Sequence, residues 1–169
     1  MKRTIVVLLF SFISFGCSHL PQELSVAEKI ELLPFDEVGD MDLVPTNYQA
    51  LWGGVIAKTV NYTDRTQIEV VYFPLNDRGE PDETQESLGR FKVYIGDFVD
   101  PYVYRPGRLV TVLGTLGVRE KGYVGNYFYD YTVLHALKLH LWEGKNVLPF
   151  LPSEEPLEKV RSRPLFSYQ

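Results

Sequence analysis

Two carboxylates near the middle of the chain could do acid–base chemistry. Asp97 and Asp100 stand close together just before Pro101. A pair of carboxyl groups can supply the proton donor and the proton acceptor of a hydrolase. The same residue types are typical of a turn, because an Asp beside Gly96 and another before a proline accept hydrogen bonds from nearby backbone amides. The turn is the stronger interpretation, and an envelope hydrolase or accessory enzyme is the alternative.

The histidines and the acidic residues do not have the spacing of a metal site. His135 and His140 are five residues apart in one expected strand, and strict alternation places them on opposite faces of a sheet, while His19 belongs to another segment. An acidic cluster lies in a gap between two expected strands, without the ordered ligand spacing of an EF-hand. Its members are Glu80, Asp82, Glu83 and Glu86. We predict a solvated loop, no metal ion and no cofactor, with a weak cation site in the loop as the alternative.

Tyrosine is concentrated in one part of the chain, since seven of the eleven tyrosines fall between Tyr94 and Tyr131. Tyr127, Tyr129 and Tyr131 alternate along one expected strand and therefore share a face. If that face is open, it is a stacking platform for a sugar, a peptide or a partner protein. The residues favour the alternative, in which the tyrosines line the wall of the domain or pack beneath the proline-rich tail, with their hydroxyls at the rim.

The composition is that of one ordinary globular domain. The chain has 169 residues, of which 45% are hydrophobic and 23% are charged. Its single cysteine excludes an intrachain disulfide and a cysteine-cluster metal site. The sequence pI of about 5.2 opposes nucleic-acid binding, which needs a basic surface.

Residues 49–143 are the part of the chain that must position these side chains. Short β-branched and aromatic runs alternate there with polar, Gly- or Pro-containing gaps, which predicts an all-β domain. Glycines inside the long runs, such as Gly53, Gly54, Gly114 and Gly117, indicate strong bends or bulges. A small five-stranded OB-like barrel is the expected fold, with a β-sandwich as the alternative. The expected strands are residues 50–60, 66–73, 90–95, 108–118 and 127–142.

The segments on either side of this domain have a different character. Residues 17–48 are expected to form a tether with one short helix over residues 23–33. Residues 144–169 contain four prolines and no sustained periodicity, which predicts an extended, proline-rich tail. One further hypothesis is that Arg161, Arg163 and Phe166 in this tail dock on another component.

The first residues read as an export signal. Lys2 and Arg3 precede an apolar run over residues 5–15, which is too short to span a bilayer, and Gly16 stands directly before Cys17. This order resembles the lipobox of bacterial lipoproteins, although residues 14 and 15 depart from its usual pattern. The resemblance implies a signal peptide over residues 1–16, a diacylglyceryl group on the Cys17 thiol and an acylated new amino terminus. The alternative is an ordinary cysteine behind a secretory signal.

Six segments occur in a consistent order over about residues 48–143. They are WGGVI at 52–56, TQIEVVYFPL at 66–75, GRF at 89–91, FVDP at 98–101, GRLVTVLG at 107–114 and LHLW at 139–142. Together they resemble the Slp family of starvation-inducible outer-membrane lipoproteins of Gram-negative bacteria. The chain departs from the family at residues 125–132, where an acidic residue and a proline are usual.

The resemblance implies a lipid-anchored protein of the outer membrane whose domain faces the periplasm, with a link to starvation or stationary phase and no established catalytic residue. Ser18 agrees with an outer-membrane location, because many such lipoproteins that stay in the inner membrane have Asp directly after the lipidated cysteine. Removing residues 1–16 would leave a formal charge of −7. We therefore expect a non-enzymatic binding or structural module, anchored through Cys17, whose partner is an envelope protein, peptidoglycan or lipopolysaccharide and not nucleic acid.

Overall fold

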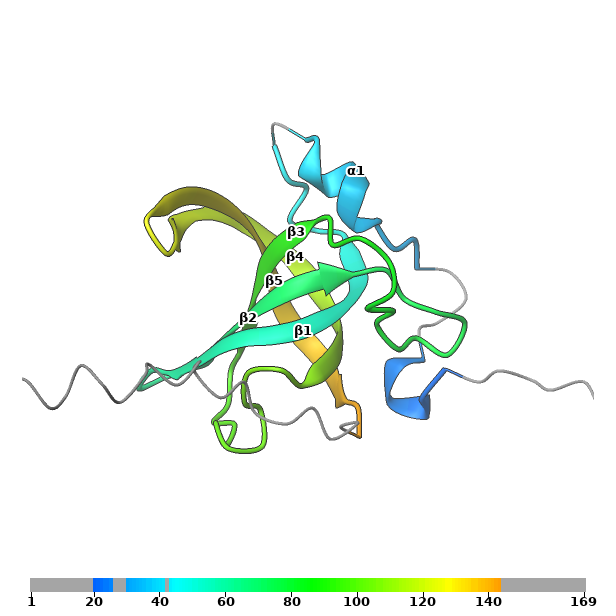
Figure 1. Ribbon diagram of the computed structural model, residues 1–169. Coiled ribbons are helices and arrows are strands. Elements are labelled where there is room, and N and C mark those ends of the chain that lie inside the picture. The colour runs from blue at the N-terminus through cyan, green and yellow to red at the C-terminus, as the bar shows by residue number, and fades with distance from the viewer. Residues whose placement is uncertain (1–19, 26–29, 42, 144–169) are drawn as a thin grey trace, which may run out of the picture.

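Five strands close into a barrel in the computed structural model, which describes residues 20–25, 30–41 and 43–143 (Figure 1). The strand order around the barrel is β1-β2-β3-β5-β4. Only β3 and β5 pair in parallel among the described strands, and the other neighbours are antiparallel. The strands are β1 (Gln49–Asn61), β2 (Thr66–Phe73), β3 (Gly89–Ile95), β4 (Leu109–Val124) and β5 (Tyr127–Leu141). This is the five-stranded OB-like barrel expected from the sequence, and its closure excludes the two-sheet sandwich.

The barrel interior is built by the alternation visible in the sequence. On β2, Ile68 and Val70 are buried, and on β3, Phe91 and Val93 are buried, while the residues between them face outward. Burial of large apolar side chains is the main favourable contribution to folding. The interior is completed by buried residues of the other strands, namely Ala50, Trp52, Ile56, Val110, Val112, Leu116 and Leu134.

Two glycines allow the backbones of neighbouring strands to approach closely. A Cβ on Gly54 would collide with the carbonyl oxygen of Val71 on β2. A Cβ on Gly114 would lie 2.7 Å from the carbonyl oxygen of His135 on β5, at a point where the register of β4 and β5 shifts. The bulges expected at Gly114 and Gly117 are present as register shifts between β4 and β5. The pairing of β1 runs unbroken through Gly53 and Gly54, and its shift against β2 lies instead between Ile56 and Lys58. Such irregularities bend the strands around the barrel.

The bulge opposite Gly114 changes which face the histidines occupy. Leu134, Ala136, Leu139 and Leu141 all face the core. Inward residues are two positions apart in regular β5, but Ala136 and Leu139 are three apart because of the bulge between them. His135 and His140 therefore both point outward, and the prediction of opposite faces was wrong because it assumed unbroken alternation.

These two histidines still do not meet. His135 stacks on Tyr94, whereas His140 Nδ1 lies 3.3 Å from Oε2 of Glu23. No group of three or more potential metal ligands occurs within the part of the chain that the structure describes.

The segment before β1 packs on the barrel. It contains a 3-10 helix, η2 (Gln22–Leu24), and one short helix, α1 (Phe35–Gly39), which covers one end of the barrel. Leu24, Phe35 and Val38 are buried, so the described residues of this segment are held against the domain.

The short helix is not where the sequence analysis expected it. Ser25 is extended and Leu32 forms a bridge with Gln49, so the described residues of 23–33 are not one helix, and residues 26–29 lie outside the described chain. The helix instead begins after Pro34, because proline cannot continue a preceding helix and its fixed φ suits a helix start.

Several predictions fall outside the described residues. These are the signal peptide, the lipidated Cys17, His19 and the tail over residues 144–169. Within the described ranges, no helix has the length and apolar character needed to cross a membrane.

Candidate functional site

The β4–β5 hairpin extends past the barrel (Figure 1), and exposed aromatic residues lie at its tip. Tyr123, Tyr127 and Phe128 are 68%, 74% and 52% exposed. The rings of Tyr123 and Phe128 lie edge to face with centroids 5.9 Å apart. Gly125, with a φ of 60°, makes the turn between the strands, because an L-residue with a side chain rarely adopts that conformation. We call Tyr123, Tyr127 and Phe128 the hairpin tip.

The three tyrosines of the expected platform have different surroundings. Tyr127 is exposed and Tyr129 is half-buried, but Tyr131 is only 1% exposed. The Lys92 ammonium lies 4.8 Å from the centroid of the Tyr131 ring and covers it, because the twisted hairpin curls this face against β3. A platform formed by all three open rings is therefore absent, and a platform at Tyr127 and Tyr129 stays a prediction.

The hydroxyls of the two inner tyrosines are occupied. The Tyr129 hydroxyl oxygen accepts a hydrogen bond from the Arg90 backbone N–H at 2.8 Å. The Tyr131 hydroxyl lies 3.1 Å from Oε1 of Glu69 and 3.3 Å from the Tyr123 carbonyl oxygen. Burial, followed by the charge and hydrogen bond of Glu69, raises the pKa of Tyr131 to about 12. These two side chains fasten the hairpin to the barrel.

A second set of contacts between the hairpin and the barrel lies beside Tyr129 and Tyr131, on the outer face of the barrel. Lys92 Nζ donates to Oε2 of Glu120 at 2.9 Å, and the Tyr94 hydroxyl donates to the same oxygen at 2.7 Å. Burial raises the pKa of Tyr94, and the hydrogen bond to Glu120 adds to this. Desolvation opposes the charge of Glu120, but the hydrogen bonds from Lys92 and Tyr94 and the charges of Lys92 and Arg65 outweigh it, so the Glu120 pKa is lowered.

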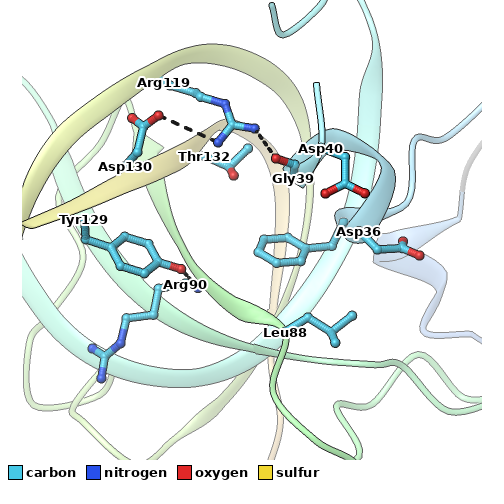
Figure 2. A pocket seen from close by; sticks show the side chains of 10 residues that line it. Asp36, Gly39, Asp40, Leu88, Arg90, Arg119, Tyr129, Asp130 and Thr132 are labelled. Carbon is cyan, nitrogen blue, oxygen red and sulfur yellow. Dashed lines mark hydrogen bonds and ion pairs between the residues drawn. The ribbon is translucent and has the colours of Figure 1, made fainter. Parts of the chain in front are cut away.

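A cleft of about 360 Å³ lies between α1 and the inner face of the hairpin (Figure 2). Arg119 spans it, because its guanidinium donates to the carbonyl oxygens of Val38 at 2.6 Å and Gly39 at 2.8 Å, and lies 3.9 Å from a carboxylate oxygen of Asp130. The cation thus caps the C-terminal end of α1. We call this space the hairpin cleft, and its lining is Phe35, Asp36, Gly39, Asp40, Leu88, Arg90, Arg119, Tyr129, Asp130 and Thr132.

The lining of the hairpin cleft combines hydrogen-bond acceptors with aromatic rings. Carboxylates from Asp36, Asp40 and Asp130 provide acceptors, and the rings of Phe35 and Tyr129 provide apolar surface. Sequence reasoning identified Tyr129 but missed the rest of this lining. Arg119 carried no local signal, because its hydrogen bonds join residues that are about eighty positions apart.

Asp97 and Asp100, the two carboxylates considered for acid–base chemistry, instead accept hydrogen bonds within a turn. Asp97 Oδ1 accepts a hydrogen bond from the Phe98 N–H at 2.8 Å, and Asp100 Oδ1 accepts one from the Tyr102 N–H at 2.8 Å. Both side chains are exposed. These bonds agree with the turn interpretation of the pair.

In the acidic loop between β2 and β3, Glu80 and Asp82 likewise interact with side chains and backbone groups of the same loop. Glu80 pairs with Arg78 at 3.1 Å. Asp82 Oδ1 accepts hydrogen bonds from the backbone N–H and the hydroxyl of Thr84 at 3.1 and 2.6 Å. Such contacts are those of a solvated loop that organises its own turns.

Comparison with known proteins identifies the family of the chain. The family described as "Outer membrane lipoprotein Slp family" matches residues 15–166. The chain belongs to the Slp family. It is 25% identical over 149 residues to "Outer membrane protein Slp" of Escherichia coli K12, which covers 88% of this chain and 79% of that protein.

Two other relatives are similar over most of the chain. An uncharacterized protein of Haemophilus influenzae Rd is 31% identical over 141 residues, covering 81% of this chain and 76% of that protein. The "Uncharacterized lipoprotein YeaY" of Escherichia coli K12 is 25% identical over 133 residues, covering 79% and 68%. The resemblance read from the ordered segments is thus confirmed.

Solved structures with a similar barrel include single-stranded DNA-binding proteins. A mitochondrial one from S. cerevisiae has a TM-score of 0.34 at 13% identity, covering 55% of this chain and 92% of that chain. A small one from Streptomyces coelicolor has a TM-score of 0.36 at 11% identity, covering 60% and 95%.

Proposed function

We propose that this Slp-family chain is anchored in the outer membrane through a lipidated Cys17 and presents its barrel to the periplasm as a non-enzymatic binding or structural module. The observation that carries the proposal is the extent of the family match, which begins at residue 15 and so includes Cys17 together with the whole barrel. Two of the relatives carry the words outer membrane or lipoprotein in their names, which supports the same address.

The contacts of the candidate acid–base pair support a role without catalysis. Each carboxylate of Asp97 and Asp100 accepts a backbone hydrogen bond in an exposed turn. A general acid or base must instead be within reach of a substrate proton, usually in a concave site. The hydrolase alternative therefore has no supporting contact at these two residues.

The hairpin tip suits a partner, because it exposes aromatic rings on both faces of the hairpin, with Tyr123 and Phe128 on one face and Tyr127 on the other. Exposed aromatic rings lose water favourably and stack on flat ligands, and they are enriched at interfaces. The hairpin cleft next to it adds carboxylate acceptors that suit a hydroxyl-rich ligand. We propose that an envelope component binds here, and that peptidoglycan is the first candidate, since its glycan strands combine hydroxyl groups with apolar sugar faces.

The anchor is tested by mass spectrometry of the mature N-terminus. We expect a chain that begins at Cys17 and carries a diacylglyceryl group and an amide-linked acyl chain. Replacing Cys17 with Ser should release the domain from the membrane fraction, because three acyl chains hold a protein far more firmly than the marginal binding given by one. An unmodified Cys17, or cleavage at another position, would overturn the anchor.

We also propose a link to starvation, which rests on the family resemblance alone. The amount of protein should rise in stationary phase relative to exponential growth. An immunoblot normalised to a constitutive outer-membrane protein checks this, and an unchanged level in both phases would contradict it.

A further inference from the structure

The first described residues sit firmly on the barrel, close to the proposed anchor. Leu24 is fully buried, and the Lys138 ammonium donates to the Ser25 carbonyl oxygen at 3.2 Å. Only residues 18 and 19 separate Cys17 from Leu20. Three peptide steps span at most about 11 Å whatever their conformation. A lipid on Cys17 would therefore hold this end of the barrel close to the membrane surface.

The loop between β3 and β4, residues 96–108, lies at the same end of the barrel. Oε2 of Glu23 in η2 is 3.3 Å from Nδ1 of His140, whose ring contacts Trp142 with centroids 4.5 Å apart. The Trp142 carbonyl oxygen accepts a hydrogen bond from Arg108 Nη2 at 2.7 Å. This chain of contacts joins η2 to the loop. Burial raises the pKa of Tyr104 in the loop, and the charge of Glu23 adds to this.

The loop exposes aromatic and apolar side chains that suit a lipid headgroup region, beside the carboxylates of Asp97 and Asp100, which accept backbone hydrogen bonds within the loop. Phe98 is 70%, Tyr102 80% and Val103 42% exposed. The guanidinium of Arg105 lies 5.9 Å from the centroid of the Tyr102 ring. Aromatic residues and arginines together are typical of the interfacial zone of a membrane, where the rings sit at headgroup level and the cations meet phosphates. Removing their apolar area from water in this zone is favourable.

We propose that the β3–β4 loop is a membrane-contacting surface, in which Phe98, Tyr102 and Val103 enter the headgroup region of the leaflet that holds the Cys17 anchor and Arg105 contacts lipid phosphate. The proposal rests on the lipid anchor and adds an orientation to it. η2 and the loop face the bilayer, and the hairpin tip, which lies across the barrel from η2 in Figure 1, points away from it. The tip is thereby free for a partner in the periplasm.

The test compares labels at the two places in the full lipidated chain. The natural sequence has one cysteine. Its thiol is consumed by the lipid, so Val103→Cys and Asn126→Cys each give one free thiol for an environment-sensitive fluorophore. The proteins are bound to vesicles of phosphatidylethanolamine and phosphatidylglycerol that contain headgroup spin-labelled lipid. We expect quenching at position 103 at least about twofold stronger than at position 126, because interfacial side chains enter about 5–10 Å into this boundary.

A second variant separates docking from anchoring. Phe98→Ser combined with Tyr102→Ser should remove the excess quenching at position 103 while the acylated protein still floats with the vesicles. Val118→Ser is the matched control, because Val118 is 75% exposed on the hairpin and should leave the quenching unchanged. Circular dichroism checks that each variant keeps its fold.

The outcomes are distinguishable. Equal quenching at both positions, or stronger quenching at position 126, in a protein that is acylated and vesicle-bound would overturn the orientation and leave the anchor standing. A protein without acyl groups that does not float with the vesicles would overturn the anchor, and the docking surface with it.

Discussion

The aromatic residues of the barrel interior and those of the hairpin tip are used in opposite ways. Trp52 packs edge to face on Phe35 and Phe91, with centroid distances of 5.0 and 5.5 Å, and all three rings are buried. The hairpin tip has one ring contact, between Tyr123 and Phe128, and its rings are mostly exposed. The difference separates two environments: the interior aromatics stabilise the fold, and those of the tip are exposed to solvent, where we propose that a partner binds.

The largest expected effect is on the interior. Trp52→Ala should lower the free energy of unfolding by about 3–5 kcal/mol, the usual cost of truncating a large buried aromatic residue. It also removes the hydrogen bond from the indole N–H to the Leu33 carbonyl oxygen at 2.9 Å. Urea denaturation followed by circular dichroism measures the loss. Trp52→Phe keeps an aromatic ring, so its free energy of unfolding should lie between those of the natural chain and Trp52→Ala. A loss below about 1 kcal/mol for Trp52→Ala would remove the distinction between the interior and the hairpin tip.

The interior is also the part that sequence alone predicts well. Alternation along β2 and β3, with Ile68 and Val70 or Phe91 and Val93 inward, is a local pattern that survives in the fold. The end of β4 was missed by several residues, because Glu120, Lys121 and Gly122 continue as strand by pairing across the hairpin, although residues of these types are depleted in strands. Pairing of this kind is not encoded in local composition.

The candidate site is less predictable, because its geometry depends on long-range contacts. Tyr131 and Tyr127 are the same residue type on the same strand, yet only Tyr131 is covered, by Lys92 from β3. Arg119 reaches α1, a helix of five residues whose position no periodicity indicated. A single bulge at Gly114 was enough to reverse the face assigned to a histidine.

The next largest expected effect on stability concerns the hydrogen bonds of Tyr131, which join the hairpin to the barrel. Tyr131→Phe removes a buried hydroxyl that lies within hydrogen-bond distance of Glu69 and of the Tyr123 carbonyl oxygen. We expect a loss of about 0.5–1.5 kcal/mol in the free energy of unfolding. Tyr127→Phe is the matched control, because its exposed ring should tolerate the change. Equal losses in the two variants would contradict the assignment of Tyr131 to the interior side.

The same hydroxyl predicts an alkaline pH dependence. Tyr131 has a pKa of about 12 in the folded chain against an ordinary value of 10.0. A raised pKa favours the protonated form, so its contribution is complete below pH 10 and is lost as the pH rises from 10 to about 12. Tyr131→Phe should flatten this part of the stability curve. Denaturation midpoints measured across this range test the prediction, and curves that stay parallel would count against it.

Glu120 gives a smaller effect at acid pH. Its pKa is lowered from 4.5, so its contribution is present above pH 4.5 and is lost as the pH falls through the folded value. Glu120→Gln should reduce this acid-side loss of stability. Lys92→Met should do the same, because it removes the cation that holds the carboxylate charged. If both variants keep the acid slope of the natural chain, the pair does not couple the hairpin to the barrel.

The smallest expected change in stability is at the hairpin tip, where the largest change in binding is expected. Tyr127→Ala combined with Phe128→Ala should alter the free energy of unfolding by no more than about 0.5 kcal/mol for each exposed position. The same double variant should lose binding of the soluble domain to purified peptidoglycan in a co-sedimentation assay, because the rings that would stack on sugar faces are gone. Leu137→Ala, at an exposed residue elsewhere on β5, is the control that should bind as the natural chain does. Unchanged sedimentation of the tip variant would exclude this surface as the peptidoglycan site, and a large loss of stability would instead make these rings part of the folding core.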